Sequence, residues 1–321
     1  MKQLWRRMVG VVALTACAGA GAQAPFPDKP IRILIGFPAG TTADVIARVL
    51  APHMAQTLGG QVVIENRPGA GSSIAAEAVA RAPVDGHTLL MATIANTINP
   101  SLYKLGFDFA RDLAPVTKIA ELPGLLVAHP SAPAQSLQQL AAAAKAKPGE
   151  IMYASSGNGT VTHLYGELFN LATGAKLAHV PYKGSSQAVT DLLAGRIAVM
   201  FSPASTVIPH VRAGTLKAVG AIGPQRSAAL PDVPTFAESG VPGFEAGLWF
   251  GMMAPAGTPA AVIDRIHQSV LRALALPEVK AQLAGQGIEL ATMNGEQFGA
   301  FIRQDIEKWT RVVKAAGIKV E

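Results

Sequence analysis

Apolar residues along the chain follow two alternating patterns, short strand-like runs and longer stretches with helical spacing. Strand-like runs occupy residues 31–37, 61–65 and 87–93. Helical patterns lie between them, at residues 43–58 and 73–81. Pro52 falls inside the first helical pattern and should kink or interrupt that helix. This βαβαβ order predicts a parallel sheet covered by helices.

A second alternating series begins after Leu122-Pro123-Gly124. Its strands are predicted at residues 125–128, 151–155, 177–180, 197–201 and 216–221, and its helices at residues 137–145, 163–173, 188–194 and 205–213. The last part differs, with a strand at 247–254 and two amphipathic helices at 260–274 and 296–315. On the final helix an apolar stripe is expected to be core, namely Phe298, Phe301, Ile302, Ile306, Trp309 and Val313.

The two series predict an α/β protein with two lobes. The chain should enter the second lobe near Pro123 and leave it within the Pro/Gly-rich residues 231–242. We therefore assign residues 23–123 and 236–321 to the first lobe and residues 124–235 to the second. Two crossings between lobes are typical of a hinge.

The N-terminus, residues 1–22, is predicted to be a signal peptide. A positively charged start precedes a short apolar stretch, residues 8–16, which is too brief to span a bilayer. Ala20-Gly21-Ala22 fits ordinary cleavage, whereas Leu14-Thr15-Ala16-Cys17 fits a lipobox that would place a lipid anchor on Cys17. Ordinary cleavage is slightly favoured, because the signal peptides of many exported proteins end in a similar Ala-Gln-Ala run. Either route exports the mature chain, which we expect in the periplasm.

Composition indicates a globular chain of 321 residues, with 50% hydrophobic and 15% charged content. Cys17 is the only cysteine, so removal of the signal leaves no disulfide or thiol chemistry. Three of the 27 Lys and Arg lie in the signal, and the net charge falls from +6 to +3. Because no basic run or aromatic–basic interleaving is present, we expect no nucleic-acid partner. The mild positive charge suits anionic small molecules.

Polar, glycine-containing loops join strands to helices at three places, residues 38–42, 153–160 and 181–187. Helix starts carry unpaired N–H groups that attract anions, and ligands of open parallel sheets lie beyond the carboxyl ends of the strands. The first two loops, facing each other across a cleft, would grip a carboxylate. Alternatively, Thr41 or Thr42 only caps its own helix. Lys183 in the third loop is either a ligand contact or a solvated lysine.

Catalytic and metal-binding motifs are weak. Ser156, His163 and Asp191 could form a triad on paper, but no Gly-x-Ser-x-Gly elbow surrounds Ser156. The seven histidines show no metal-ligand spacing, and Gly69-Ala70-Gly71 lacks the third glycine of a dinucleotide fingerprint. We therefore expect neither metal nor cofactor. An exported hydrolase using the same cleft is the alternative function.

Short motifs in order along the mature chain resemble the Bug-type (TctC-like) extracytoplasmic solute receptors of tripartite tricarboxylate transporters. These motifs are Lys29-Pro30-Ile31, Phe37-Pro38-Ala39-Gly40 with Asp44, Glu65-Asn66-Arg67-Pro68-Gly69-Ala70-Gly71, Asp85-Gly86, Asn99-Pro100-Ser101-Leu102-Tyr103, Ser155-Ser156-Gly157, Tyr182-Lys183-Gly184 and Leu230-Pro231-Asp232-Val233-Pro234-Thr235.

The resemblance implies a type II periplasmic-binding-protein fold, with two α/β lobes around a central cleft and a two-crossing hinge. It implies capture of a small organic carboxylate for membrane permease subunits, without catalysis, and we expect a monomer. A sensory receptor feeding a signalling partner is a further alternative. The ligand-binding residues that the resemblance implies are Phe37, Gly40, Thr41, Thr42, Thr93, Asn96, Ser155, Ser156, Gly157, Thr160, His163, Tyr182 and Ser202.

Three departures from the family pattern bear on the ligand. Ala39 and Thr41 replace a proline and a glycine of the first loop, and Gln187 stands where proline is usual. Ser202 replaces a common aspartate, and this disfavours amino acids because an ammonium group would lack its acid. Asp44, in the first turn of its helix, is interpreted as structural support for the loop.

Overall fold

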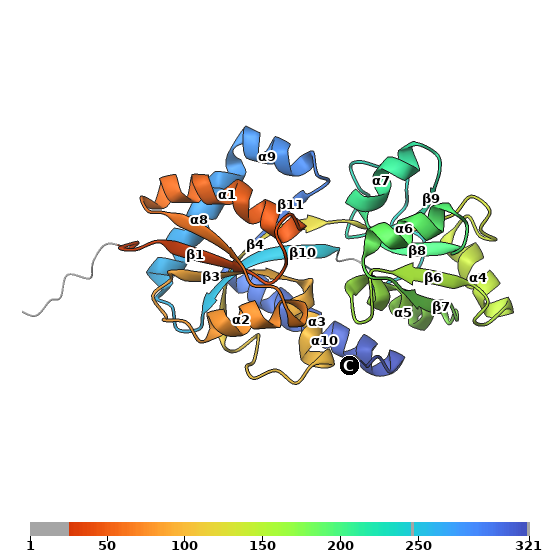
Figure 1. Cartoon of the computed structure of the whole chain (residues 1–321), viewed down its shortest axis with the longest axis horizontal. Coiled ribbons are helices and arrows are strands. Elements are labelled where there is room, and N and C mark those ends of the chain that lie inside the picture. Colours follow the sequence, from red (N-terminus) through yellow and green to blue (C-terminus); the bar gives the residue numbers. More distant parts are fainter. Residues whose placement is uncertain (1–25, 245–246, 320–321) are drawn as a thin grey trace, which may run out of the picture.

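The computed structural model describes residues 26–244 and 247–319, which form two α/β lobes side by side (Figure 1). The first lobe contains a six-stranded sheet. Across that sheet the strands are β11 (Glu289–Asn294), β4 (Leu113–Leu122), β10 (Leu248–Pro255), β3 (Thr88–Thr93), β1 (Ile31–Ile35) and β2 (Val62–Asn66). Strand β1 pairs in parallel with β2 and β3, as the βαβαβ pattern predicted, whereas β10 is antiparallel to β3 and β4.

Helices cover both faces of the first sheet. One face buries α1 (Thr42–Leu58), α8 (Ala260–Ala275) and α9 (Pro277–Ala284). The other face buries α2 (Ser73–Ala80), α3 (Ile94–Leu102) and α10 (Gly295–Ala316), with the short 3-10 turn η1 (Ala70–Ser72) beside them. Strand β3 is buried at all six positions and β1 at all but Arg32, and this explains the largely hydrophobic runs of these two enclosed strands.

The second lobe contains a five-stranded sheet with its own helices. Across this sheet the strands are β7 (Ala178–Pro181), β6 (Met152–Ser155), β8 (Val199–Pro203), β5 (Gly124–Ala128) and β9 (Lys217–Ile222). Its helices are α4 (Leu137–Ala146), α5 (Val161–Thr173), α6 (Ser185–Leu193) and α7 (Ala204–Arg212). The alternation predicted for this half of the chain is therefore observed.

Several elements differ from the sequence-based prediction: strands β4 and β11 and helices α3 and α9 were not predicted, and α1 was expected to be kinked or interrupted at Pro52. Helix α1 continues through Pro52, whose side chain is exposed to solvent, so the alternative of an interrupted helix is wrong. Strand β4 was not predicted, because Lys118 and Glu121 interrupt its apolar pattern. Both side chains are nearly fully buried in the strand and pair with each other, so their charges are matched inside the protein.

The chain passes between lobes at two adjacent places. Strands β4 and β5 belong to different sheets and are separated only by Pro123. A Cβ on Gly247, just before β10, would lie 2.7 Å from the Leu122 carbonyl oxygen, so only glycine permits the two crossings to touch. Phe236 and Phe244 stack at 4.2 Å within the second lobe. These contacts favour a return of the chain to the first lobe after Phe244, later than the predicted boundary between residues 235 and 236. That domain boundary stays a prediction.

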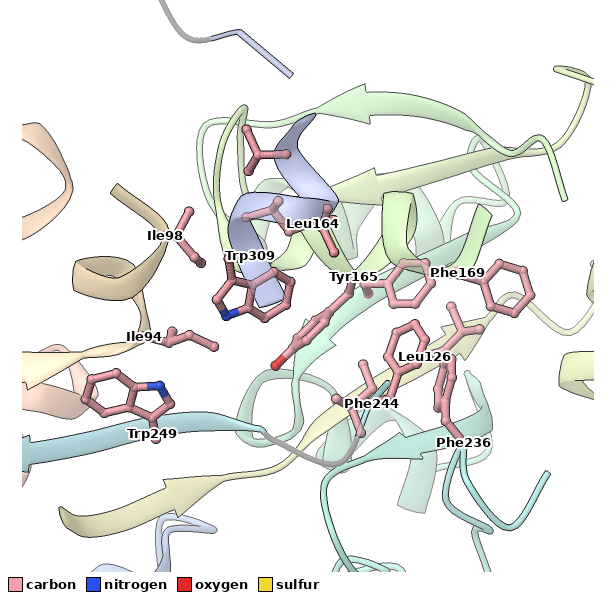
Figure 2. Close-up of a cluster of buried hydrophobic side chains, with 14 of the residues drawn as sticks. Ile94, Ile98, Leu126, Leu164, Tyr165, Phe169, Phe236, Phe244, Trp249 and Trp309 are labelled. Atoms are coloured by element: carbon pink, nitrogen blue, oxygen red, sulfur yellow. The ribbon is translucent and has the colours of Figure 1, made fainter. Parts of the chain in front are cut away.

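A single apolar cluster joins the two lobes (Figure 2). Trp309 of α10 lies 5.9 Å, between ring centroids, from Tyr165 of α5, and Ile98 of α3 belongs to the same cluster. All three side chains are essentially inaccessible to solvent. Much of the stripe predicted on the final helix is thus confirmed as core, and part of that core spans the lobes.

The loop between β1 and α1 is held by the buried carboxylate of Asp44. Its two oxygens accept hydrogen bonds, each 2.9 Å long, from Gly40 N, Arg48 Nε and Asn66 Nδ2. Burial alone would raise the pKa of Asp44, but these three hydrogen bonds outweigh it and lower the pKa to about 2. The carboxylate therefore stays ionised and fixes the loop backbone from inside.

Two stacked imidazoles support the loop between β6 and α5. The rings of His163 and His179 lie 3.7 Å apart and nearly parallel. His163 Nδ1 accepts a hydrogen bond from Gly159 N at 3.1 Å, and His179 Nε2 lies 2.6 Å from Ser155 Oγ. Burial lowers the pKa of both histidines to about 4, and the neighbouring His163 adds to the effect on His179. Both rings are therefore neutral at pH 7.

Replacing Asp44 should destabilise the first lobe. We expect Asp44→Asn to lower the free energy of unfolding by about 1–2 kcal/mol at pH 7. The effect is moderate because Arg48 is half-exposed, so that solvent screens part of its ion pair with Asp44. Since the pKa of Asp44 is lowered to about 2, this contribution is present above pH 3.8 and is lost as the pH falls through 2. Urea unfolding measures it, and the exposed Asp264→Asn serves as control. Equal stability of both variants would contradict this role.

Acid should destabilise the second lobe through the imidazole pair. The unfolded chain binds protons below pH 6.5, whereas the folded histidines resist protonation down to about 4, so stability present at pH 7 is lost across this interval. When the pH falls from 7 to 4.5, the free energy of unfolding should decrease by about 2 kcal/mol less in His179→Gln than in the wild type. Gln56→Ala, at an exposed and uncharged position of helix α1, should keep the wild-type slope. A slope unchanged in His179→Gln would refute the effect.

Candidate functional site

A cavity of about 310 Å³ lies between the lobes, at the carboxyl ends of β1, β3 and β6. Its wall is contributed by the β1–α1 loop, the start of α3, the β6–α5 loop and the hinge strand β10. The lining residues are Phe37, Thr41, Thr42, Ala43, Gly71, Thr93, Ile94, Ala95, Ile98, Asn99, Tyr103, Ser156, Asn158, Gly159, Thr160, Val161, Leu248, Trp249 and Phe250. This position agrees with the rule that ligands bind beyond the carboxyl ends of parallel strands.

Two helices begin at this cavity without a side-chain cap, one from each lobe. Thr41 precedes α1, but its hydroxyl donates to the Pro38 carbonyl at 2.9 Å. Thr160 precedes α5, and its hydroxyl donates to the Gly157 carbonyl at 2.7 Å. The alternative that Thr41 or Thr42 only caps helix α1 is therefore wrong, because the side chain of the N-cap residue Thr41 makes no capping hydrogen bond and Thr42 is already the first residue of the helix. Because no side-chain cap covers the first-turn N–H groups, these can receive an anionic ligand.

Helix α3 also begins at the cavity, but its start is capped by its own residues. Thr93 Oγ1 accepts a hydrogen bond from Ala95 N at 3.3 Å, and Asn96 Oδ1 accepts one from Thr93 N at 2.9 Å. Thr93 lines the cavity, whereas Asn96 is buried in this cap. The three helix starts thus differ, and only those of α1 and α5 lack a side-chain cap.

The structure brings several of the residues implied by the resemblance to this one cavity. Those that line it are Phe37, Thr41, Thr42, Thr93, Ser156 and Thr160. Those that do not are Gly40, Asn96, Ser155, Gly157, His163, Tyr182 and Ser202. Most of the second set hold the loops that the first set belongs to.

Gly40 and Gly157 shape the loop backbones. Their φ angles, 83° and 138°, lie in the region that favours glycine. Gly40 N is bound by Asp44, and the Gly157 carbonyl accepts the Thr160 hydroxyl. Ser155 is fully buried between Gly157 and the imidazole pair. These residues act on the cavity through the backbone conformation that they stabilise.

Tyr182 and Ser202 are engaged elsewhere. The Tyr182 hydroxyl donates to Asp191 Oδ2 at 2.9 Å, and burial together with this carboxylate raises the pKa of Tyr182 to about 12. Ser202 is fully buried in β8, where its hydroxyl donates to the Pro203 carbonyl at 3.1 Å. Asp191 also pairs with Arg196 at 2.8 Å.

The improbable triad is not assembled among the described residues. The Ser156 hydroxyl lies 2.8 Å from that of Thr162, and His163 Nδ1 accepts from Gly159 N, so the two residues have different partners. Asp191 is held by Tyr182 and Arg196. No hydrogen bond or ion pair joins any two of the three.

Sequence reasoning missed the apolar wall of the cavity. Ile94, Ile98 and Tyr103 belong to α3 or follow it directly, and this helix was not recognised because Pro100 lies inside it. Trp249 and Phe250 were assigned to a strand without a role in the site. The usable signal was the motif at residues 99–103, which marked the resemblance without suggesting a cavity.

Neither a metal-binding cluster nor a membrane-spanning helix is found among the described residues. Within residues 26–244 and 247–319, no group of three His, Cys, Asp or Glu residues is placed to hold a metal ion. No helix in the same ranges combines the length and apolarity needed to cross a membrane. The predicted signal peptide, residues 1–22, and Cys17 lie outside the described residues.

Comparison with known proteins supports the resemblance that the sequence motifs indicate. Residues 46–318 match the model of the tripartite tricarboxylate transporter family receptor. The chain is 37% identical over 318 residues to protein BugT of Bordetella pertussis, and the match covers 98% of both chains.

Two solved structures from Rhodopseudomonas palustris are similar throughout. Rpa4515 with adipate is 33% identical, with a TM-score of 0.77, covering 92% of this chain and 99% of that one. MatC with bound malate is 31% identical, with a TM-score of 0.73, covering 90% and 100%. The resemblance inferred from the sequence motifs and the two-lobed periplasmic-binding-protein fold are thereby confirmed. The chain belongs to the tripartite tricarboxylate transporter receptor family.

Proposed function

We propose that this protein is a periplasmic receptor that binds a small organic carboxylate in the cavity between its lobes and delivers it, as a monomer, to membrane permease subunits. The observation that carries the proposal is the pair of helix starts without side-chain caps, Thr41–Thr42 in one lobe and Thr160–Val161 in the other. Similar proteins with bound malate and adipate support it. Export is supported by the predicted signal peptide at residues 1–22.

Binding would use backbone N–H groups from both lobes. A carboxylate that accepts hydrogen bonds from the starts of α1 and α5 is bound more strongly when both lobes contact it. The ligand therefore favours the closed arrangement of the lobes. Closure also removes water, and each hydrogen bond is stronger in the drier site.

This function needs no bond-breaking chemistry. A hydrolase would require a nucleophile and a base beside the ligand, yet Ser156 and His163 have separate partners. Ser155 does contact His179, but the Ser155 side chain is fully buried and does not line the cavity. We therefore propose that the protein binds its ligand without converting it.

Filling the cavity should abolish binding without unfolding the protein. Thr42 lines the cavity at the first residue of α1, and Thr42→Trp should lower the affinity for any bound carboxylate at least about ten-fold, because an indole occupies the ligand's space. Thr57→Trp, near the other end of the same helix, is the matched control. Isothermal titration calorimetry measures the affinity, and circular dichroism checks that both variants fold.

A panel of carboxylates tests the function itself. The mature protein, refolded from denaturant to remove any copurified ligand, should show a raised melting temperature with at least one of hexanoate, phenylacetate, adipate, malate and citrate. Titration then gives the affinity. If no member of the panel shifts the melting temperature, or if Thr42→Trp binds as tightly as Thr57→Trp, this function or this site is wrong.

A further inference from the structure

We propose that Asp305, on helix α10, is a positioning residue for ligand binding: its carboxylate sets the orientation of Trp249 in the cavity wall and holds α3 beside it. The inference rests on the proposed function and adds to that site a residue that does not itself line the cavity. Three observations carry it: the burial of Asp305, its two hydrogen-bond donors and the packing of the Trp249 indole.

Asp305 is an acid on the apolar stripe of α10. Its neighbours on the buried face of this helix include Ile302 and Trp309, and Asp305 itself is only 4% exposed. Burial raises the pKa of Asp305, and hydrogen bonds from Thr97 and Trp249 partly offset this effect. An apolar residue at this position would avoid the cost of removing a carboxylate from water. The contribution of Asp305 therefore lies in the hydrogen bonds that it accepts.

One oxygen of this carboxylate accepts hydrogen bonds from two elements of the cavity wall. The Trp249 indole N–H, on the hinge strand β10, donates to Asp305 Oδ2 at 2.9 Å, and the Thr97 hydroxyl, on α3, lies 2.6 Å from the same atom. That hydroxyl is also 2.8 Å from the Ile94 carbonyl, but its single proton goes to the shorter bond with the charged acceptor. Trp249 lines the cavity, and Thr97 lies in sequence between the lining residues Ile94 and Ile98.

Three residues of α10 contact the Trp249 indole. Phe298 and Phe301 meet it edge to face, with ring centroids 5.4 and 5.7 Å away and interplanar angles of 82° and 85°. These contacts bury the ring, but they are less directional than a hydrogen bond to a charged acceptor. The bond to Asp305 therefore fixes the orientation of the indole within its apolar slot.

Helix α10 also carries the contact between the lobes. Trp309, one turn after Asp305, packs against Tyr165 of the second lobe (Figure 2). Burial, and after it the nearby charge of Asp305, raise the pKa of Tyr165. Asp305 thus lies where the hinge strand, the α3 wall and the contact between the lobes meet, so its loss would reach the cavity from several sides.

Binding measurements on matched variants test the role of Asp305. In the refolded mature protein, Asp305→Leu should weaken binding of the carboxylate that binds best among hexanoate, phenylacetate, adipate, malate and citrate about ten-fold, because Trp249 and Thr97 lose their acceptor. Asp305→Asn keeps an acceptor oxygen and should bind within about two-fold of the wild type. As control, Thr310→Val removes only the exposed 2.7 Å hydrogen bond between α10 and Ser101 of α3, and its affinity should be unchanged. Circular dichroism checks the folding of each variant.

The indole N–H resonance of Trp249 gives a readout that needs no ligand. The sequence contains three tryptophans, and Trp5 lies in the predicted signal peptide, so the mature protein should show two indole resonances. The resonance that disappears in Trp249→Phe belongs to Trp249. In ligand-free Asp305→Leu it should move upfield and its proton should exchange faster with solvent, because the hydrogen bond is lost. In Asp305→Asn it should stay close to its wild-type position.

The outcomes separate this inference from the proposed function. If the wild type binds none of the five carboxylates, the proposed function fails and the role of Asp305 in binding fails with it. If the wild type binds, the role of Asp305 alone is wrong in any of three cases: Asp305→Leu binds equally tightly, its Trp249 resonance is unchanged, or Asp305→Asn is as weak as Asp305→Leu. Should Asp305→Leu not fold, Thr97→Val replaces it and should weaken binding about three-fold. Wild-type affinity in Thr97→Val would then overturn the inference.

Discussion

The packing of Trp309 against Tyr165 fixes the geometry on which the site depends. Trp309 belongs to the C-terminal helix of the first lobe, and Tyr165 follows the α5 start by little more than one turn. Helix α5, whose start borders the cavity without a side-chain cap, is therefore anchored to the opposite lobe through buried apolar contact. Because Ile94 and Ile98 both line the cavity and join the same cluster, the wall and the anchor are one continuous core.

Each lobe fixes its cavity-lining loop by a different kind of chemistry. The first uses an ionised carboxylate, Asp44, bound by three donors, and the second uses the neutral stacked rings of His163 and His179. In both cases the supporting groups bind loop atoms that precede the helix. The first-turn N–H groups of α1 and α5 are left without a side-chain cap. The loops are thus held in place while the first-turn N–H donors of both helices stay free of a side-chain cap.

The sequence predicted the fold more completely than the site. Apolar periodicity identified the parallel strands and most helices, and the glycine and threonines after β1 identified one of the helix starts that border the cavity. Helix α3 and strand β4 escaped, because Pro100 and the buried pair Lys118–Glu121 contradict local rules that tertiary packing overrides. The hydroxyl of Tyr182 was assigned to the cleft, but its bond to Asp191 depends on tertiary contacts that no single-sequence pattern reveals.

The adjacent crossings at Pro123 and Gly247 determine how the lobes can move. Two connections in contact with each other form one axis, and the α10–α5 contact is a third point of support away from it. Three such points that do not lie on one line hold the lobes in one relative orientation, so a change in that orientation has to break the α10–α5 contact. A change in the shape of the cavity between the lobes is therefore coupled to the packing of Trp309 against Tyr165.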